Sequence, residues 1–319
     1  MKVLLTGSSG WLGRFLAPQL REAGHEVVGL DIAPGADTQV IGSVADRDLV
    51  RHVVGDGIET IIHGGALHKP DIARYPKQAF IDTNVTGTLN LLEAAAEAGH
   101  DRFVFTSTTS LMVSDNVHAG SSEAAFWMDE AFHEGPPRNI YGITKAAAEG
   151  LCRLFAAEHA MDIAILRTGR FFPEDDDTHH DLPGNNLKAS EFLNRRLSAA
   201  DAARAHVVAL DKIAGLGCET FVLSAPPVFA REEAAELARD ARSVIARHYP
   251  DAAVLYAAQG WQLPERIDRV YDPAKAERLL GFRCETDFAS VLAALRDGRE
   301  LPFDHDPAYL PPKETVDTG

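Results

Sequence analysis

Short apolar segments alternate with longer segments of helical periodicity through the first half of the chain. The segments that we interpret as strands span residues 2–6, 26–30, 60–63, 102–107 and 162–167. The segments that we interpret as helices span residues 11–23, 76–98 and 140–159. In the second helix, apolar side chains recur at roughly helical spacing. Such alternation predicts the doubly wound α/β class, a parallel sheet with helices on both faces.

The second half of the chain is less regular. Residues 171–194 are rich in Pro, Asp, His, Gly and Asn without a clear period, which predicts loop and short helix over a site. Further elements are predicted as helices at residues 200–209, 231–248, 273–280 and 288–296, and as a strand at residues 219–223. We therefore expect a smaller C-terminal α/β lobe, ending in an extended arm after residue 301.

Composition narrows the possible partners. The chain has 319 residues, with 47 acidic and 31 basic side chains and a net charge of −16. A polyanion repels nucleic acid and anionic membranes, so we expect neither as a partner. The three cysteines form no CxxC motif, which favours a reducing cytoplasm and argues against a disulfide framework or a zinc site. The apolar run at residues 3–5 ends at Thr6-Gly7, so we interpret it as a buried strand rather than a signal peptide.

A glycine-rich loop, TGSSGWLG at residues 6–13, lies between the first strand and the first helix. Spaced glycines let the backbone approach a pyrophosphate, and the helix N-terminus offers N–H donors to phosphates. Asp31 ends the next strand, where a carboxylate binds the adenosine ribose hydroxyls and repels a 2′-phosphate, which predicts NAD rather than NADP. The residues of this loop that we expect to contact NAD are Gly7, Ser9, Gly10, Trp11, Leu12 and Gly13.

Tyr141 and Lys145 are four positions apart on a predicted helix, so they share a face. A lysine ammonium beside a phenol favours the phenolate and can bring the pKa of a tyrosine from ~10 toward neutrality. Such a tyrosine is a usable general acid/base. The strand before this helix ends in the hydroxyl-rich run 106–110, which can orient a substrate oxygen toward the tyrosine.

At this point the chain resembles the extended short-chain dehydrogenase/reductases. TGSSGWLG matches their TGxxGxxG loop, and YGITK matches their Tyr-Lys motif. The other matching segments, in chain order, are IIHGGA at 61–66, DTNVTGTLNLLEAA with Asn84, FVFTSTTS with Thr108, LRTGRFFPE with Pro173, and RRLSAADAARAHVVAL. The resemblance covers residues 1–210 and, less specifically, DPAKAERLLGF near the C-terminus.

The resemblance implies a Rossmann fold, NAD as cofactor and specific roles. Tyr141 is expected to be the general acid/base, Lys145 to tune its pKa and hold the ribose, and Thr108 to hydrogen-bond the substrate oxygen. The remaining cofactor contacts that it implies are Ser43, Val44, Gly64, Ala66, Asn84 and Pro173. Many relatives have Asp at the position of Ser43. The residues proposed to face the substrate are His68, Thr109 and Arg170.

The resemblance also predicts domain organisation and assembly. Residues 1–169 are expected to form the NAD-binding domain, to which residues 196–225 return. Residues 170–195 and 226–319 are expected to form the substrate-binding lobe and C-terminal arm, with the insertion 113–137 lining or covering the cleft. The helices at residues 76–98 and 140–159 commonly pair with their two-fold mates in this family, so we predict a homodimer.

Three reactions compete within the family. Dehydratases place Asp-Glu after the catalytic Thr, where this chain has Thr109-Ser110, so dehydration is disfavoured. The segment between Pro173 and Asp201 is short, as in uronate dehydrogenases, although the arginine that binds the carboxylate there aligns with His179. We therefore favour NAD-dependent oxidation or reduction of a small sugar, sugar acid or polyol. Nucleotide-sugar 4-epimerisation with tightly bound NAD, and a non-catalytic NAD-binding protein, stay open as alternatives.

One histidine and an acidic stretch have simpler interpretations. His63 is expected to pack in the core or against the cofactor. The run DDDTHHD at residues 175–181 resembles a metal site in composition, but it lacks fixed ligand spacing and the reaction needs no metal. We therefore predict a solvated or substrate-covering loop there, and no metal.

Overall fold

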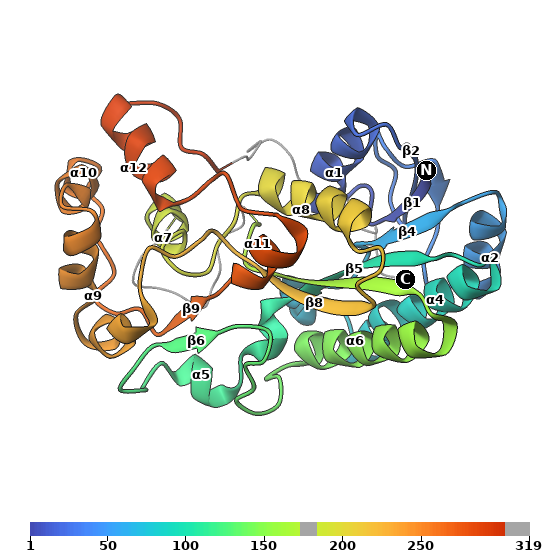
Figure 1. Ribbon diagram of the computed structural model, residues 1–319, viewed down its shortest axis with the longest axis horizontal. Helices are drawn as coiled ribbons and strands as arrows, with labels where there is room; N and C mark the ends of the chain where they lie inside the picture. Colours follow the sequence, from blue (N-terminus) through green and yellow to red (C-terminus); the bar gives the residue numbers. More distant parts are fainter. Residues whose placement is uncertain (173–183, 304–319) are drawn as a thin grey trace.

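The computed structural model describes residues 1–172 and 184–303, and its centre is a seven-stranded parallel sheet (Figure 1). The strands are β1 (Lys2–Thr6), β2 (Glu26–Asp31), β3 (Val40–Ile41), β4 (Thr60–His63), β5 (Arg102–Thr108), β7 (Asp162–Thr168) and β8 (Cys218–Leu223). Their order is β3-β2-β1-β4-β5-β7-β8, and every pair within this sheet is parallel. The order reverses between β1 and β4, which is where doubly wound sheets bind ligands at the carboxyl ends of their strands.

Alternate strand residues point to opposite faces of the sheet, and each face carries its own helices. Leu5 belongs to a core shared with α1 (Trp11–Glu22), α8 (Ala199–Lys212) and α11 (Ala274–Leu280). Leu4 belongs to the opposite core, which contains residues of α2 (Arg47–Gly55), α4 (Gly87–Glu97) and α6 (Ile140–His159). The predicted doubly wound Rossmann fold is therefore confirmed.

The helix expected over residues 76–98 is interrupted. It consists of α3 (Lys77–Phe80), a π-helical segment η2 (Ile81–Thr86) and α4. The helix expected over 231–248 begins as a 3₁₀ turn, η4 (Arg231–Glu233), and continues as α9 (Ala234–His248), which breaks at Asp240. Apolar periodicity does not distinguish these local departures from a regular helix, because side-chain spacing changes little over one turn.

The C-terminal part has its own hydrophobic core. This core is built from residues of α7 (Gly184–Glu191), α9, α10 (Ala252–Ala258) and α12 (Phe288–Asp297). Beside it, the insertion at residues 113–137 forms α5 (Asp115–Ala119) and β6 (Phe126–Met128). The strand β6 pairs in parallel with β9 (Arg269–Tyr271). The insertion is thus attached to the C-terminal part rather than lying free, while its role over a cleft stays a prediction.

Asp201 joins α8 to the C-terminal part. Its buried carboxylate accepts hydrogen bonds from the backbone N–H groups of Glu285 (2.9 Å) and Thr286 (3.0 Å) and from Arg204 (2.8 Å). This explains why an aspartate stands three positions after the N-cap Ser198, in the first turn of α8. The domain boundaries given above stay predictions.

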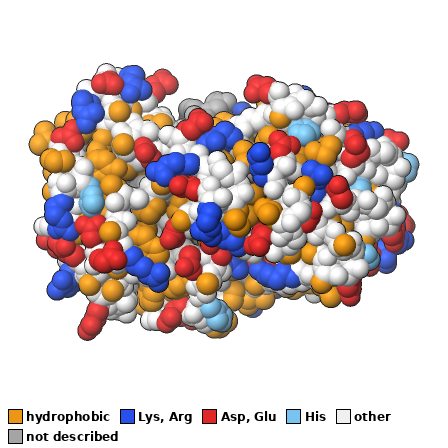
Figure 2. All heavy atoms as spheres, viewed as in Figure 1, with side chains coloured by type: hydrophobic (Ala, Val, Ile, Leu, Met, Phe, Trp, Pro, Cys, Tyr) orange, Lys and Arg blue, Asp and Glu red, His pale blue; other side chains and the backbone are white. Residues whose placement is uncertain are grey.

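Charged side chains of both signs are interspersed over the face of the molecule seen in Figure 2. Within residues 1–172 and 184–303, none of the helices is both long enough and apolar enough to span a bilayer. In the same residues no cluster of three His, Cys, Asp or Glu side chains is arranged to hold a metal ion.

Candidate active site

The glycine loop after β1 is closely packed against the turn after β4. Gly7 has φ +77°, and a Cβ there would lie 2.8 Å from the backbone nitrogen of Gly65. A Cβ on Gly13 would overlap the carbonyl oxygens of Gly7 and Ser8. Both positions therefore require glycine, for a left-handed backbone at Gly7 and for close approach of α1 at Gly13. Gly10 is the N-cap of α1 and has no side chain to satisfy the first N–H groups, which suits an anion such as a pyrophosphate.

Asp31 is held beside this loop at the end of β2. Its Oδ2 accepts a hydrogen bond from the Ser9 N–H (3.0 Å), and its Oδ1 accepts one from the Ala33 N–H (3.2 Å). Burial raises the pKa of the Asp31 carboxyl above its usual value, and the backbone N–H groups of Ser9, Ala33 and Ile32 oppose that shift. The carboxylate is thus fixed at the carboxyl end of β2, next to β1, on the edge of the sheet where doubly wound folds bind dinucleotides.

The predicted adenine-side residues lie after β3. The Ser43 hydroxyl accepts from the Ala45 N–H (3.1 Å), and Val44 is buried against Gly87. Sequence reasoning missed Asn90 of α4, whose amide donates to the carbonyl oxygens of Val44 (3.0 Å) and Ala45 (3.1 Å). Its side chain fixes the loop that carries Val44.

The hydroxyl groups of Thr108 and Tyr141 lie close enough to interact, and this interaction opposes the rise that burial causes in the pKa of Tyr141. Thr108 ends β5 and accepts a hydrogen bond from the Ser110 N–H (3.1 Å). Tyr141 lies in the first turn of α6. This helix begins after Asn139, whose side-chain oxygen accepts a hydrogen bond from the Gly142 N–H (3.0 Å). Because Thr108 already accepts from the backbone, its own proton is free to point at the phenol oxygen.

Lys145 lies on the same face of α6, but its contacts differ from those expected. Its Nζ donates to the carbonyl oxygen of Thr106 (2.8 Å) and lies 4.6 Å from the centre of the Phe105 ring. Burial lowers the pKa of Lys145 to about 7, and burial raises the pKa of Tyr141 to about 12, with Asp71 adding to the rise. The expectation that Lys145 brings the pKa of Tyr141 toward neutrality is therefore wrong for this structure. Removal from water disfavours the charged form of each side chain, and it is the largest cause of both pKa shifts.

His63 is a core histidine, as predicted. Its Nδ1 lies 2.7 Å from the Thr6 hydroxyl and its Nε2 lies 3.1 Å from the Thr88 hydroxyl. Thr6 also accepts from the Gly65 N–H (3.0 Å), and Thr88 donates to the Asn84 carbonyl (2.7 Å). Because the Thr88 hydroxyl donates its proton to Asn84, it accepts from His63, which places the ring proton on Nε2. Burial lowers the pKa of His63 well below its usual value. His63 is therefore neutral and structural.

His68 lies beside Tyr141. Its ring centre is 5.7 Å from that of Tyr141 and 5.2 Å from that of Phe172, both in edge-on geometry. Burial, with a smaller contribution from Lys145, lowers the pKa of His68 to about 3, so the imidazole is neutral. Within residues 1–172 and 184–303, its buried Nδ1 has no hydrogen-bond partner.

Three other predicted residues have protein partners. The Asn84 amide bonds the backbone of Leu67 and the Thr144 hydroxyl, so it fixes the 64–68 loop on α6. The Thr109 hydroxyl donates to the Thr168 carbonyl (3.2 Å), and Arg170 donates to Glu191 (3.2 Å). The remaining predicted loop contacts, Gly64 and Leu12, pack together, since a Cβ on Gly64 would touch the Leu12 side chain. Pro173 and the run 175–181 lie outside the described residues.

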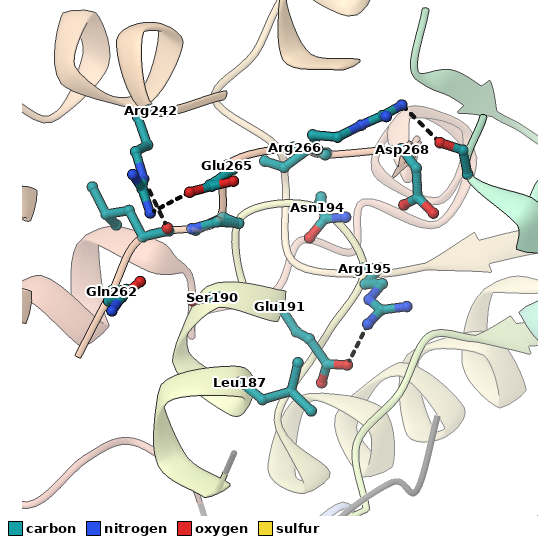
Figure 3. Close-up of a pocket in the computed structure, with 14 residues that line it drawn as sticks. Leu187, Ser190, Glu191, Asn194, Arg195, Arg242, Gln262, Glu265, Arg266 and Asp268 are labelled. Atoms are coloured by element: carbon teal, nitrogen blue, oxygen red, sulfur yellow. Dashed lines mark hydrogen bonds and ion pairs between the residues drawn. The ribbon is translucent and has the colours of Figure 1, made fainter. Parts of the chain in front are cut away.

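A cavity of about 530 Å³ opens between α7 and residues 262–268. Figure 3 shows Glu191 and Arg195 pointing toward one another at one side and Arg242 beside Glu265 at the other, while Arg266 extends away from both pairs and donates to the carbonyl oxygen of Gly120. Tyr141 does not line this cavity. The two regions are connected through Arg196, which pairs with Glu191 and donates to the carbonyl oxygen of Phe172. The Phe172 ring in turn packs against His68. Sequence reasoning missed these arginines because their convergence depends on how distant segments pack.

A family model decides the classification. The model of the NAD dependent epimerase/dehydratase family matches residues 3–223. The chain belongs to this family. The resemblance to extended short-chain dehydrogenase/reductases is thereby confirmed, and so is NAD as the cofactor.

Individual relatives match over part of their length. A low-salt glycan biosynthesis protein from Haloferax volcanii is 32% identical over 183 residues, covering 53% of this chain and 56% of that protein. A uronate dehydrogenase from Pseudomonas syringae pv. tomato is 26% identical over 183 residues, covering 54% and 60%. A short-chain dehydrogenase/reductase superfamily protein from Agrobacterium tumefaciens, solved with bound NAD, aligns over 93% of this chain and 98% of its own at 23% identity and a TM-score of 0.64. The chain thus spans little more than half the length of these two curated relatives, and the solved structure shows the shared fold.

Proposed function

We propose that this protein is an NAD-dependent oxidoreductase that transfers hydride to or from a hydroxyl-bearing carbon of a small sugar, sugar acid or polyol. The observation that carries the proposal is that the hydroxyl groups of Thr108 and Tyr141 lie close together, with Lys145 on the same face of α6 as Tyr141. The pair lies at the carboxyl end of β5, beside the switch point of the sheet. Hydroxyl groups at this place suit a reaction that moves one proton at a carbinol oxygen.

Each side chain has a defined part in that reaction. Bound NAD supplies the hydride acceptor, or in reverse the reduced form supplies the hydride. Tyr141 exchanges a proton with the substrate oxygen, and Thr108 hydrogen-bonds the same oxygen and fixes its direction. The high pKa of Tyr141 makes the phenol the resting form, which donates a proton to a carbonyl oxygen. The opposite direction needs the phenolate, which a charged Lys145 favours.

His68 is proposed to contact the substrate. It is neutral, it packs edge-on against Tyr141, and its Nδ1 is buried without a partner among the described residues. A buried polar atom without a partner is costly, so a substrate hydroxyl that binds Nδ1 recovers that free energy. Thr109, which donates to the Thr168 carbonyl, and Arg170, which donates to Glu191, are further candidates for substrate contact.

One observation favours a second function, nucleotide-sugar 4-epimerisation. The cavity near α7 is lined by Arg195, Arg242 and Arg266, of which Arg195 pairs with Glu191 and Arg242 pairs with Glu265. Guanidinium groups bind phosphates well, so a substrate with a diphosphate fits this lining. An epimerase reduces and reoxidises its NAD within one turnover, and therefore produces no net NADH.

A homodimer is proposed on the surface of α6. Ile143 and Leu154 are each 49% exposed on that helix, and Gly150 between them is also exposed. Apolar and small side chains along one exposed helix face suit close packing against a second copy of the helix.

The experiment that separates the two functions is a substrate screen. The purified protein is incubated with NAD and with aldoses, uronic acids or polyols, and NADH is followed by absorbance. In parallel, nucleotide sugars are incubated without added reductant, and the products are separated by chromatography. NADH formation with a small substrate supports the first proposal. Conversion of a nucleotide sugar to its 4-epimer without NADH supports the second and overturns the first.

A further inference from the structure

The loop between β2 and β3, residues 32–39, is fastened to the glycine loop by hydroxyl groups. The Oγ1 of Thr38 lies 2.7 Å from the Oγ of Ser8 and 2.6 Å from the Oγ of Ser9. The Ser9 hydroxyl also donates to the carbonyl oxygen of Ala33 (2.8 Å). Both serines are buried, and Thr38 is half-buried. Thr38 therefore joins two segments that follow the carboxyl ends of β1 and β2.

The direction of these hydrogen bonds follows from the number of protons. A hydroxyl group carries one proton, and Ser9 gives its own to the Ala33 carbonyl, which is only an acceptor. Ser9 therefore accepts from Thr38, and Thr38 in turn accepts from Ser8. The result is a directed chain of three hydroxyl groups in which each bond polarises the next. The middle hydroxyl, that of Thr38, takes part in two of these hydrogen bonds.

The loop is also closely packed where it meets Ser9. A Cβ on Gly35 would lie 2.5 Å from the Ser9 Oγ, so the loop approaches this closely only with glycine there. At the end of the loop, the Gln39 side chain accepts from the Gly29 N–H (2.6 Å), and the Gln39 N–H donates to the Gly29 carbonyl (3.0 Å). The end of the loop is thus anchored on β2, while its middle depends on Thr38.

The closed loop fixes the carboxylate of Asp31. Its two oxygens accept from the N–H groups of Ser9 (3.0 Å) and Ala33 (3.2 Å). These are the same two residues that the Ser9 hydroxyl joins, so the three hydrogen bonds form a closed ring. If the loop moves away from Ser9, Ala33 moves with it, and one oxygen of Asp31 loses its donor. Thr38 therefore acts on Asp31 through Ser9 and Ala33.

The donors of this region are already in use. A 2′-phosphate is bound through N–H or O–H donors or through a cation. Here the three hydroxyl protons and the N–H groups of Ser9 and Ala33 all have acceptors inside the protein. Arg21, in the last turn of α1, forms an ion pair with Asp37 of the loop. The closed loop thus offers the Asp31 carboxylate to a ribose hydroxyl, whereas a 2′-phosphate gains these donors only when the loop opens.

We propose that Thr38 is a positioning residue for cofactor selection: its hydroxyl holds residues 32–39 closed on the glycine loop, and the closed loop binds NAD in preference to NADP. NAD then binds the closed form, whereas NADP binds after the loop has opened. A change that weakens closure shifts the two affinities in opposite directions, because each dinucleotide prefers a different form. The inference rests on the assignment of Asp31 to the ribose and not on the proposed reaction, so it is testable without a substrate.

The test is calorimetric titration of the full-length protein with NAD and with NADP. Thr38→Val removes the hydroxyl at nearly constant volume, and with it two hydrogen bonds. Because one such bond changes an equilibrium constant by roughly fivefold, we expect the ratio of the two Kd values to move toward NADP by roughly tenfold or more. Thr38→Ser keeps the hydroxyl and is expected to stay within about twofold of the wild-type ratio. Equal weakening of both dinucleotides would show a merely structural role and overturn the proposal.

A second variant reaches the same loop without removing a hydroxyl. Gly35→Ala places a Cβ against the Ser9 Oγ, so it is expected to shift the ratio in the same direction, and it carries the test if Thr38→Val does not fold. The matched control is Thr220→Val on β8, at the far edge of the sheet from β2. It removes another half-buried threonine hydroxyl, and neither affinity is expected to change.

Asp31→Asn separates the two contributions to cofactor selection. Full discrimination by this variant overturns the assignment of Asp31 to the ribose, whereas the ratio in the loop variants reports on closure. If Asp31→Asn binds both dinucleotides equally while Thr38→Val and Gly35→Ala keep the wild-type ratio, the charge alone selects the cofactor, and the role of Thr38 is refuted.

Discussion

Replacement of Asp31 tests the cofactor assignment. The carboxylate lies at the end of β2, fixed by the N–H groups of Ser9 and Ala33. A phosphate on the ribose 2′-hydroxyl brings at least one further negative charge close to it. Two like charges ~4 Å apart repel by about 4 kcal/mol at an effective dielectric constant of ~20, and by about 1 kcal/mol in bulk water. Since Asp31 is partly exposed, we expect NAD to bind ~5-fold to ~10³-fold more tightly than NADP.

The informative variant is Asp31→Asn. It keeps an oxygen for the Ser9 N–H and removes the charge, so NAD affinity is expected to fall modestly while the preference over NADP drops toward unity. Asp31→Ala removes both acceptors and is expected to weaken NAD as well, because two backbone N–H groups lose their partner. Asp82→Asn, at an exposed position of η2, is the control for net charge. Calorimetric titration with both dinucleotides measures these affinities. Equal binding of NAD and NADP by the wild type, or full discrimination by Asp31→Asn, refutes the assignment.

Three further outcomes are expected. Thr108→Ser should retain most of the turnover, whereas Thr108→Val should reduce it by ~10-fold or more, because only valine lacks the hydroxyl beside Tyr141. Equal steady-state rates for the two variants would count against that contact. Burial lowers the pKa of His206 to about 4, so the unfolded chain binds the proton first and stability falls on acidification. From pH 7 to pH 5 this costs about 2 kcal/mol, and His206→Gln should remove that part of the slope in urea unfolding. Light scattering should give the mass of a dimer for the wild type and the mass of a monomer for the double variant Ile143→Glu, Leu154→Glu. A wild-type protein that is monomeric at every concentration would contradict the proposed interface.

Much of the fold follows from local sequence. The strand residues Leu4 and Leu5 alternate between two cores, and the run 140–159 carries a cap at Asn139 and a full helical period, so both elements were predictable. The glycines of the first loop were also predictable, because a backbone that approaches a phosphate or a neighbouring strand excludes a side chain. The spacing of Tyr141 and Lys145 placed them on one face before any tertiary contact was known.

The remaining features depend on tertiary packing. The pKa of Tyr141 moved opposite to expectation because burial, which no local pattern reports, is the largest cause of its shift. Asn90, which holds the loop of Val44, and Glu149, which joins two strands to α6, are ordinary polar residues in helical sequence. Their roles arise from residues distant in the chain, so sequence spacing alone gives no signal for them.

The most direct test of the proposed chemistry is the turnover of Tyr141→Phe on the small substrate identified in the screen, measured together with its affinity for NAD. The phenol hydroxyl is needed to move the proton and not to hold the dinucleotide. We therefore expect kcat to fall ~10²–10⁴-fold while the Kd for NAD stays within about twofold of the wild type. A variant that keeps more than about a tenth of the wild-type turnover would show that Tyr141 is not the general acid/base.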